Sequence, residues 1–191
     1  MTHSVQARQT LTQRLYKLVF SHALTTVLAP RRRPLSIFIR VVDAGSCNDT
    51  ELEIACLANP VYDMERFGLQ IVASPRHADV LLISGPLVRS MARATVEAFL
   101  AMPSPHHIVT AGDGFLPAGM WADSYATVPL VEGLTQAWLD LNSRSSPDGR
   151  SLRDGADAFR KELEDAWIVH IPGDPPAAQH ILNVLLALWI G

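Results

Sequence analysis

The fold of this chain is decided by the stretch from Val41 to Asn59, which reads Val-Val-Asp-Ala-Gly-Ser-Cys-Asn-Asp-Thr-Glu-Leu-Glu-Ile-Ala-Cys-Leu-Ala-Asn. The apolar residues in front of Asp43 predict a β-strand, and a helix is expected to begin near Thr50. The turn between them contains glycine, and Cys47 lies in it. Strand ends and free backbone N–H groups converge at such turns in α/β folds, so this stretch is the first candidate for a functional site.

Strand and helix patterns continue to alternate along the rest of the chain. Short apolar runs predict strands over residues 37–42, 69–73, 78–85, 107–111 and 167–171. Further helices are expected over residues 87–101, where Pro86 stands at the first turn, and over residues 130–141, 156–166 and 177–190, of which 156–166 is charged and the last is apolar. The run at 78–85 is apolar throughout, which is typical of a parallel strand buried on both faces. The alternation predicts an α/β fold, a three-layer, doubly wound and mostly parallel sheet.

Composition limits the possible functions. The 191 residues suffice for one domain with a hydrophobic core, and an apolar fraction of 48% argues against disorder. The net charge of −3 gives no sign of nucleic-acid binding. The two cysteines, Cys47 and Cys56, are too few for a disulfide scaffold, and Cys56 is expected to be a buried thiol on a helix. The sequence has no Walker loop, dinucleotide fingerprint or nucleophile elbow.

The first 33 residues form a separate region in this interpretation. Apolar residues recur at helical spacing and predict an amphipathic helix; they include Leu11, Leu15, Leu18 and Val19. The basic run Arg31, Arg32, Arg33 follows the helix. The helix could pack on its own domain or dock on a partner or a membrane surface, and we predict docking. Residues 34–191 are then a single α/β domain with a mobile loop at about 142–155.

Several motifs give the chain a resemblance to one family over about residues 37–111 and 167–188. The motifs, each in the same order and at similar spacing, are Asp43-Ala44-Gly45-Ser46-Cys47, Tyr62-Asp63-Met64-Glu65-Arg66-Phe67-Gly68, Ser74-Pro75-Arg76-His77-Ala78-Asp79-Val80, Gly85-Pro86, Ala111-Gly112-Asp113, and Pro172-Gly173 with Pro175-Pro176. The chain resembles the B-type (20 kDa) subunit of NADH:quinone oxidoreductase and the small subunits of membrane-bound NiFe hydrogenases and formate hydrogenlyases. The resemblance implies a flavodoxin-like fold and a 4Fe–4S cluster facing a large catalytic subunit.

The resemblance also implies four cluster-ligand positions, at which the family has cysteine. In this chain these ligand positions hold Cys47, Thr50, Gly114 and Asp174. Four thiolates hold such a cluster, and three of them are missing here, so we predict no cofactor. The alternatives are a cluster, or a zinc ion held in part by Cys47 and Asp174. Further ligands of a mixed metal site would be Asp49, Asp113 and His170.

These observations favour a non-catalytic subunit of an oxidoreductase-like complex. The expected role is architectural, in a membrane-associated complex resembling complex I or a group 4 NiFe hydrogenase. The expected partners are a hydrogenase large-subunit or quinone-oxidoreductase 49 kDa-like subunit and membrane ion-translocating subunits, on the cytoplasmic face of the inner membrane. Candidate interface residues are Leu15, Val19, Arg31, Arg32, Arg33, Tyr62, Asp63, Arg66 and Arg76. A working electron-transfer subunit and a free-standing binding module remain as alternatives.

Overall fold

The structure is a computed structural model, and it describes residues 36–115, 121, 123–143 and 149–189. Five parallel strands form one sheet: β1 (Ile37–Asp43), β2 (Leu69–Ile71), β3 (Val80–Ser84), β4 (His107–Ala111) and β5 (Trp167–Ile171). The helices are α2 (Asp49–Cys56), α3 (Arg89–Leu100), α4 (Leu130–Asn142), α5 (Gly149–Ala166) and α6 (Ala178–Trp189). Three short 3₁₀ turns complete the described elements: η2 (Met64–Phe67), η3 (Pro75–His77) and η4 (Asp113–Phe115).

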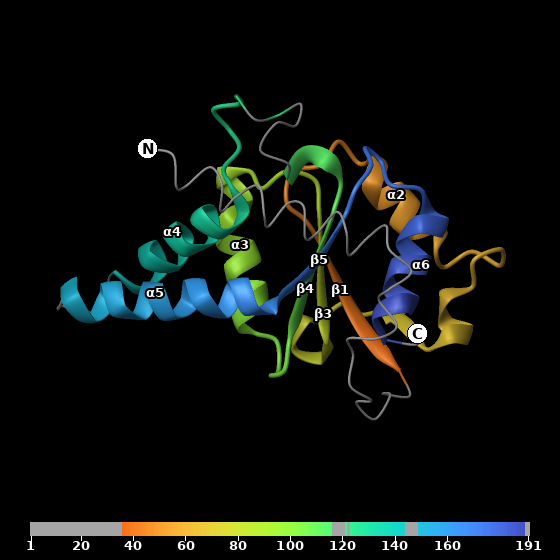
Figure 1. Cartoon of the computed structure of the whole chain (residues 1–191), viewed down its shortest axis with the longest axis horizontal. Coiled ribbons are helices and arrows are strands. Elements are labelled where there is room, and N and C mark those ends of the chain that lie inside the picture. The colour runs from red at the N-terminus through yellow and green to blue at the C-terminus, as the bar shows by residue number, and fades with distance from the viewer. Residues whose placement is uncertain (1–35, 116–120, 122, 144–148, 190–191) are drawn as a thin grey trace, which may run out of the picture.

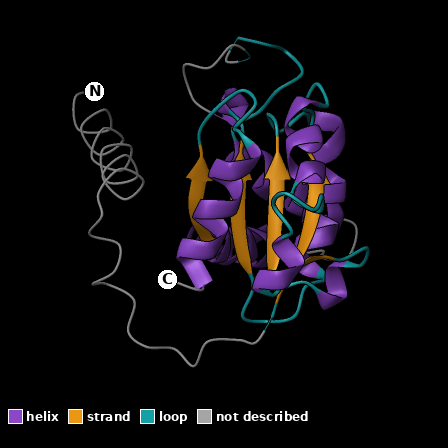
Figure 2. Cartoon of the chain, turned by 90° about the vertical axis from the view of Figure 1, so that its right-hand side faces the viewer, coloured by secondary structure: helices purple, strands orange, loops and turns teal. Residues whose placement is uncertain are grey.

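The strand order is β2-β1-β3-β4-β5, and all pairs are parallel. Figures 1 and 2 show the sheet between two helical layers, with α3, α4 and α5 on one side and α2 and α6 on the other. The chain leaves β1 toward one edge and β3 toward the other, so the switch in direction falls between these two strands. The three-layer α/β prediction is confirmed, with a strand order that is flavodoxin-like.

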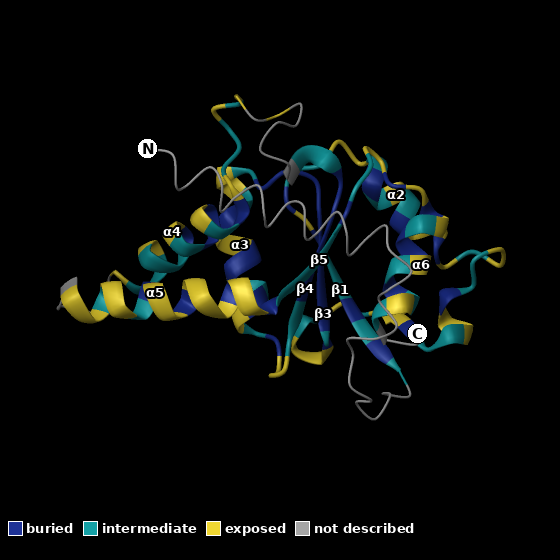
Figure 3. Cartoon of the chain, in the orientation of Figure 1, coloured by how far each residue is buried: buried dark blue, intermediate teal, exposed yellow. Residues whose placement is uncertain are grey.

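Two hydrophobic cores hold the layers together. Side chains of β1, β3 and β4 alternate between the faces, so Leu81 and Ile83 pack with α3, α4 and α5. Val80 and Leu82 instead pack with α2 and α6. Every residue of β3 is buried, as expected for a central parallel strand covered on both faces, and Figure 3 shows this burial against the exposed outer face of α5.

The structure corrects two details of the sequence analysis, and a third prediction falls outside the described residues. Helix α5 begins at Gly149, so residues 149–155 of the predicted loop are helical, and residues 144–148 lie outside the described part. Cys56 is exposed at the end of α2 and is not a buried thiol. The predicted helix and basic run in residues 1–33 lie outside the described residues. No helix within the described ranges has the length and apolarity to cross a bilayer.

Candidate functional site

The carboxyl ends of four strands form a single row, which places the loops of the ligand positions side by side. The register pairs Asp43 with Ser84, Ser84 with Ala111, and Ala111 with Ile171. Backbone hydrogen bonds extend each pairing by one residue: the N–H groups of the three residues that follow β1, β3 and β4 donate to Ser84, Ala111 and Ile171 over 3.0–3.1 Å. The loops after β1, β3, β4 and β5 therefore leave the sheet together.

The loop after β1 is fixed by its own side chains. Asp43 Oδ1 accepts hydrogen bonds from the N–H groups of Gly45 and Ser46, each over 2.9 Å. Asn48 has a left-handed backbone (φ 75°), and its N–H donates to Ser46 Oγ over 2.9 Å. This short-range network presents Cys47 at the surface, where its side chain is exposed.

The loop also lies directly on the turn after β3. Gly85 has a φ of +67°, and a Cβ atom built there would stand 2.5 Å from the backbone of Ser46. Only glycine fits this close approach without displacing the Cys47 loop. The family motif Gly85-Pro86 therefore has a steric explanation in this chain.

Glu51 joins the loop to the sheet, a contact that sequence analysis missed. Its carboxylate accepts hydrogen bonds from the hydroxyls of Ser46 and Ser84. Ser84 is fully buried at the end of β3, and its hydroxyl also contacts the carbonyl of Val42 at 3.3 Å. A charged acceptor between two serines thus ties the first turn of α2 to the centre of the sheet.

The second ligand position points inward. Thr50 is only 1% exposed, and its Oγ1 atom lies 3.4 Å from the place where a Cβ of Gly112 would stand. The hydroxyl makes no hydrogen bond of ordinary geometry among the described residues, although it lies near enough to Asp49 to help lower the pKa of that carboxyl. The loops after β1 and β4 therefore meet at Thr50.

The third ligand position is closed by a neighbouring side chain. A Cβ atom on Gly114 would stand 2.6 Å from Cδ and 2.8 Å from N of Pro86. The backbone of Gly114 does not have a positive φ, so the obstacle is steric and not conformational. A cysteine at this position would require Pro86 to move.

The fourth ligand position lies in a loop that is joined to the third. Asp113 N–H donates to the carbonyl of Gly173 over 3.0 Å, and Gly173 N–H donates to Asp113 Oδ1 over 2.8 Å. Asp174 follows and is exposed. Partial burial, then the nearby charges of Asp49 and Asp113, raise the pKa of the Asp174 carboxyl.

Cys47 and Asp49 influence each other at the rim of the site. The hydrogen bond from the thiol to the Asp49 carboxylate raises the pKa of Cys47 above its ordinary value. Burial works to raise the pKa of Asp49, but hydrogen bonds from the Cys47 thiol and the Thr50 N–H outweigh it, so that pKa is lowered. The raised pKa disfavours the thiolate, which is the form that binds metal.

The side chains at the four ligand positions do not fit a 4Fe–4S cluster. Only Cys47 offers a thiol, and Cys56 lies exposed at the far end of α2. Within the described ranges, no group of three His, Cys, Asp or Glu side chains is placed to hold a metal ion. His170 contacts Thr110 Oγ1 through Nδ1 at 2.9 Å. The expectation that the protein carries no cofactor stays a prediction.

The candidate interface residues lie elsewhere in the fold. Tyr62, Asp63 and Arg66 belong to the connection that enters β2, so they lie toward the amino ends of the strands, away from Cys47. Tyr62 packs partly against the core, and the guanidinium of Arg66 lies 4.7 Å from the ring centroid of Phe67. Arg76 is exposed on η3. Leu15, Val19 and the basic run at 31–33 lie outside the described residues. Their assignment to an interface stays a prediction.

The fold and the strand-end loops define an α/β domain with a doubly wound parallel sheet whose loops gather at one edge. Residues 47–188 match the model of the family described as NADH ubiquinone oxidoreductase, 20 Kd subunit, and the chain belongs to this family. It is 38% identical to formate hydrogenlyase subunit 7 of Escherichia coli over 90 residues, which cover 47% of this chain and 35% of that protein.

Two further similarities agree with this assignment. The chain is 39% identical over 71 residues to the probable membrane-bound hydrogenase subunit mbhJ of Pyrococcus furiosus, covering 37% of this chain and 42% of that protein. The match thus spans less than half the length of either relative. A chain in the structure of the membrane-bound sulfane sulfur reductase, an archaeal respiratory membrane complex, aligns with a TM-score of 0.55 and 20% identity, covering 82% of this chain and 70% of that chain. This last similarity supports the fold alone.

Proposed function

We propose that the protein is a cluster-less small subunit with an architectural role in a membrane-associated complex that resembles complex I or a membrane-bound NiFe hydrogenase. The proposal rests on one observation. The strand-end loops lie together, but three of the four ligand positions on them lack a thiol. Hydrogen bonds join the loops that carry Gly114 and Asp174, yet neither residue supplies a thiolate. A subunit whose strand-end loops lie together without cluster ligands is suited to joining other subunits.

Exposed aromatic side chains support the existence of a protein partner. Tyr125 is 92% exposed and Trp121 is 40% exposed. The loop that carries Tyr125 is anchored to the start of α3. The backbone N–H of Arg89 donates to the carbonyl of Ala126, and Arg89 Nε donates to the carbonyl of Tyr125. Tyrosine and tryptophan are enriched at protein interfaces. We therefore assign this loop to the contact with a large-subunit homologue of the hydrogenase or 49 kDa-like type.

Co-purification tests the partner assignment. We expect a large-subunit homologue to co-purify with the native chain from gentle detergent extracts of the host, and Tyr125→Ala to reduce its recovery. Leu100→Ala is the matched control, because Leu100 is also exposed but lies at the end of α3. A strictly monomeric native protein, or equal recovery with both variants, would contradict the assignment.

The basic amino-terminal region supports a position on the membrane surface. Residues 1–33 contain the stripe around Leu15 and Val19 and the arginines at 31–33, and they contain no acidic residue. Such a segment is attracted to anionic lipids on the cytoplasmic leaflet. Deletion of residues 1–33 should lower membrane-fraction association and leave the melting temperature unchanged. Loss of folding on deletion, or undiminished membrane association, would rule out a docking role.

The metal content of the protein tests the central claim. We expect protein purified without oxygen to be colourless and nearly free of iron, because three of the four ligand positions lack a thiol. Iron and acid-labile sulfide should be measured for each chain, with zinc measured in the same sample. About four iron and four sulfide per chain would establish the alternative, a working electron-transfer subunit. Stoichiometric zinc that is lost in Cys47→Ser would indicate a metal site at Cys47 and Asp174.

A further inference from the structure

One face of the sheet lacks a helix that the topology would ordinarily supply. The connection from β2 to β3 covers residues 72–79, and its only regular element is the three-residue turn η3. A doubly wound sheet normally has both faces covered, with a helix in each crossover between parallel strands. Helix α3 covers the neighbouring part of this face, so the surface above β1 remains open beside it.

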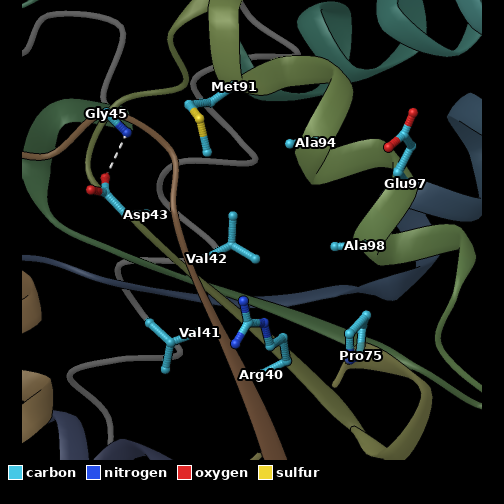
Figure 4. A pocket seen from close by; sticks show the side chains of 10 residues that line it. All are labelled: Arg40, Val41, Val42, Asp43, Gly45, Pro75, Met91, Ala94, Glu97 and Ala98. Atoms are coloured by element: carbon cyan, nitrogen blue, oxygen red, sulfur yellow. Dashed lines mark hydrogen bonds between the residues drawn. The ribbon is translucent and has the colours of Figure 1, made fainter. Parts of the chain in front are cut away.

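A groove of about 520 Å³ occupies this place. Its floor comes from β1, one wall from α3, and Pro75 of η3 closes it at one side, as Figure 4 shows. Met91, Ala94 and Ala98 face the groove from α3 at i, i+3 and i+7. These positions lie along one side of a helix, and the two alanines leave space for another backbone to approach closely.

Arg40 gives the groove its chemical specificity. The side chain is half-buried on the floor beside Val42, and it forms no ion pair with any described residue. The two acidic residues that line the groove are already engaged. Asp43 accepts hydrogen bonds from the backbone N–H groups of the turn that follows it. Glu97 forms an ion pair with Arg93, with 2.9 Å between Oε1 and Nε. A guanidinium that becomes covered needs a carboxylate opposite it, since an unpaired buried charge is costly.

The chain's own amino-terminal segment does not offer that carboxylate. No aspartate or glutamate precedes Asp43, and every charged residue in positions 1–33 is arginine or lysine. This segment would bring like charge to Arg40, which disfavours it as the occupant. An acidic side chain of another protein is therefore the favoured partner for Arg40.

We propose that this groove is the docking site for an amphipathic helix of a partner protein, in the place of the missing crossover helix. The apolar face of the partner helix lies against Met91, Ala94 and Ala98, and one of its Asp or Glu side chains pairs with Arg40. Helix-in-groove contacts of this kind use apolar anchors at i, i+3, i+4 and i+7. The contact lies on the α3 side of the sheet and does not depend on whether a cluster is bound.

Site-specific photo-crosslinking in the native host identifies the occupant. A photoreactive amino acid is placed at Ala94 or Ala98 in the full chain, and at Arg153, which is exposed on α5, as the control. We expect both groove positions to crosslink to one segment of another protein that has helical apolar spacing and an acidic residue. Crosslinks to residues 1–33, to a second copy of this chain, or at no more than the level of the control would overturn the proposal.

A charge swap then tests the ion pair. Arg40→Glu should reduce recovery of the crosslinked protein about tenfold, because like charges then oppose each other in a covered site. Changing the acidic residue of the crosslinked segment to lysine should restore recovery in the Arg40→Glu background. Arg153→Glu is the matched control, and melting temperatures verify that each variant is folded. Unchanged recovery with a folded Arg40→Glu, or failure of the swap to restore it, would refute the pairing.

Discussion

Asp113 and Gly173 hold each other through a reciprocal pair of hydrogen bonds, with distances of 2.8 and 3.0 Å. One residue follows β4 and the other follows β5, so the pair ties together the loops that carry the third and fourth ligand positions. The Gly173 N–H has a side-chain acceptor, whereas the Asp113 N–H has a backbone acceptor. Substitution of Asp113 therefore removes one bond of the pair and leaves the other.

Asp113→Ala should lower the free energy of unfolding by about 1–2 kcal/mol, because the partly buried Gly173 N–H loses its acceptor. Asp113→Asn keeps an oxygen in the same place and should cost less than half as much. Urea unfolding followed by circular dichroism measures both values. Equal effects of the two substitutions would show that the charge of Asp113, and not the hydrogen bond, is what matters.

Glu51→Ala should lower the free energy of unfolding by about 1.5–3 kcal/mol, since hydrogen bonds to a charged acceptor are stronger than neutral ones. Glu65→Ala is the control, because Glu65 is exposed on η2. A double-mutant cycle with Ser84→Ala should give a coupling energy of at least about 0.5 kcal/mol. Additive effects of Glu51→Ala and Ser84→Ala would mean that the carboxylate does not tie the loop to β3.

Gly114→Ala should destabilise the fold by about 1–3 kcal/mol, because its Cβ would overlap Pro86. Asp174→Ala should be close to neutral, since Asp174 is exposed and stands near two other carboxylates. Thermal unfolding of the two variants at neutral pH compares them directly. The melting temperature of Gly114→Ala could instead equal that of the wild type. Pro86 would then move freely, and a cysteine at position 114 would be as easily accommodated as one at position 174.

His170 should make the protein sensitive to mild acid. Burial lowers the pKa of His170 below its ordinary value of 6.5, and the charge of Asp113 opposes this only in part. The unfolded state therefore binds a proton at a higher pH than the native state does. The stabilisation is fully present above pH 6.5 and is lost as the pH falls below it, with a slope of at most about 1.4 kcal/mol per pH unit.

The variant His170→Asn should flatten this pH dependence below 6.5. The asparagine amide offers both a donor and an acceptor to the Thr110 hydroxyl, so it can replace the hydrogen bond that joins Thr110 Oγ1 and His170 Nδ1 at 2.9 Å in the native protein. His77→Asn is the control, because His77 is exposed on η3. Urea unfolding at several pH values measures the slope. An equally steep slope in the variant would assign the acid sensitivity to other groups.

Local patterns predicted most of the sheet because each strand carries its signal in adjacent residues. The apolar run ending at Gly85 identified β3, and the glycine turn before Cys47 identified the strand-end site. Helix α5 was predicted to begin late because Gly149 and Gly155 resemble loop residues. In the structure, a Cβ on Gly155 would stand 2.7 Å from Trp138, so glycine there allows α5 to pack on α4. Tertiary packing outweighs the low helix propensity of glycine at this position.

For the site, the resemblance to the family predicts the four ligand positions and nothing of the contacts around them. The four ligand positions were assigned residue by residue, and the strand register brings their loops together. The bond from Ser84 to Glu51 was missed because the two residues are 33 positions apart. The obstacle to a side chain at Gly114 is Pro86, which belongs to the loop after a different strand. Contacts between loops from different strands leave no local pattern, so the sequence of one chain does not reveal them.

The backbone bonds at the strand ends have a consequence for biogenesis. The N–H groups after β1, β3 and β4 each find a carbonyl on the next strand, and the chain thus closes the row of loops by itself. These hydrogen bonds hold the loops together through backbone groups alone. A protein without a cluster, as proposed above, should therefore reach the same fold in a heterologous host that lacks hydrogenase maturation factors, and its cellular supply would be set by translation and not by iron–sulfur assembly.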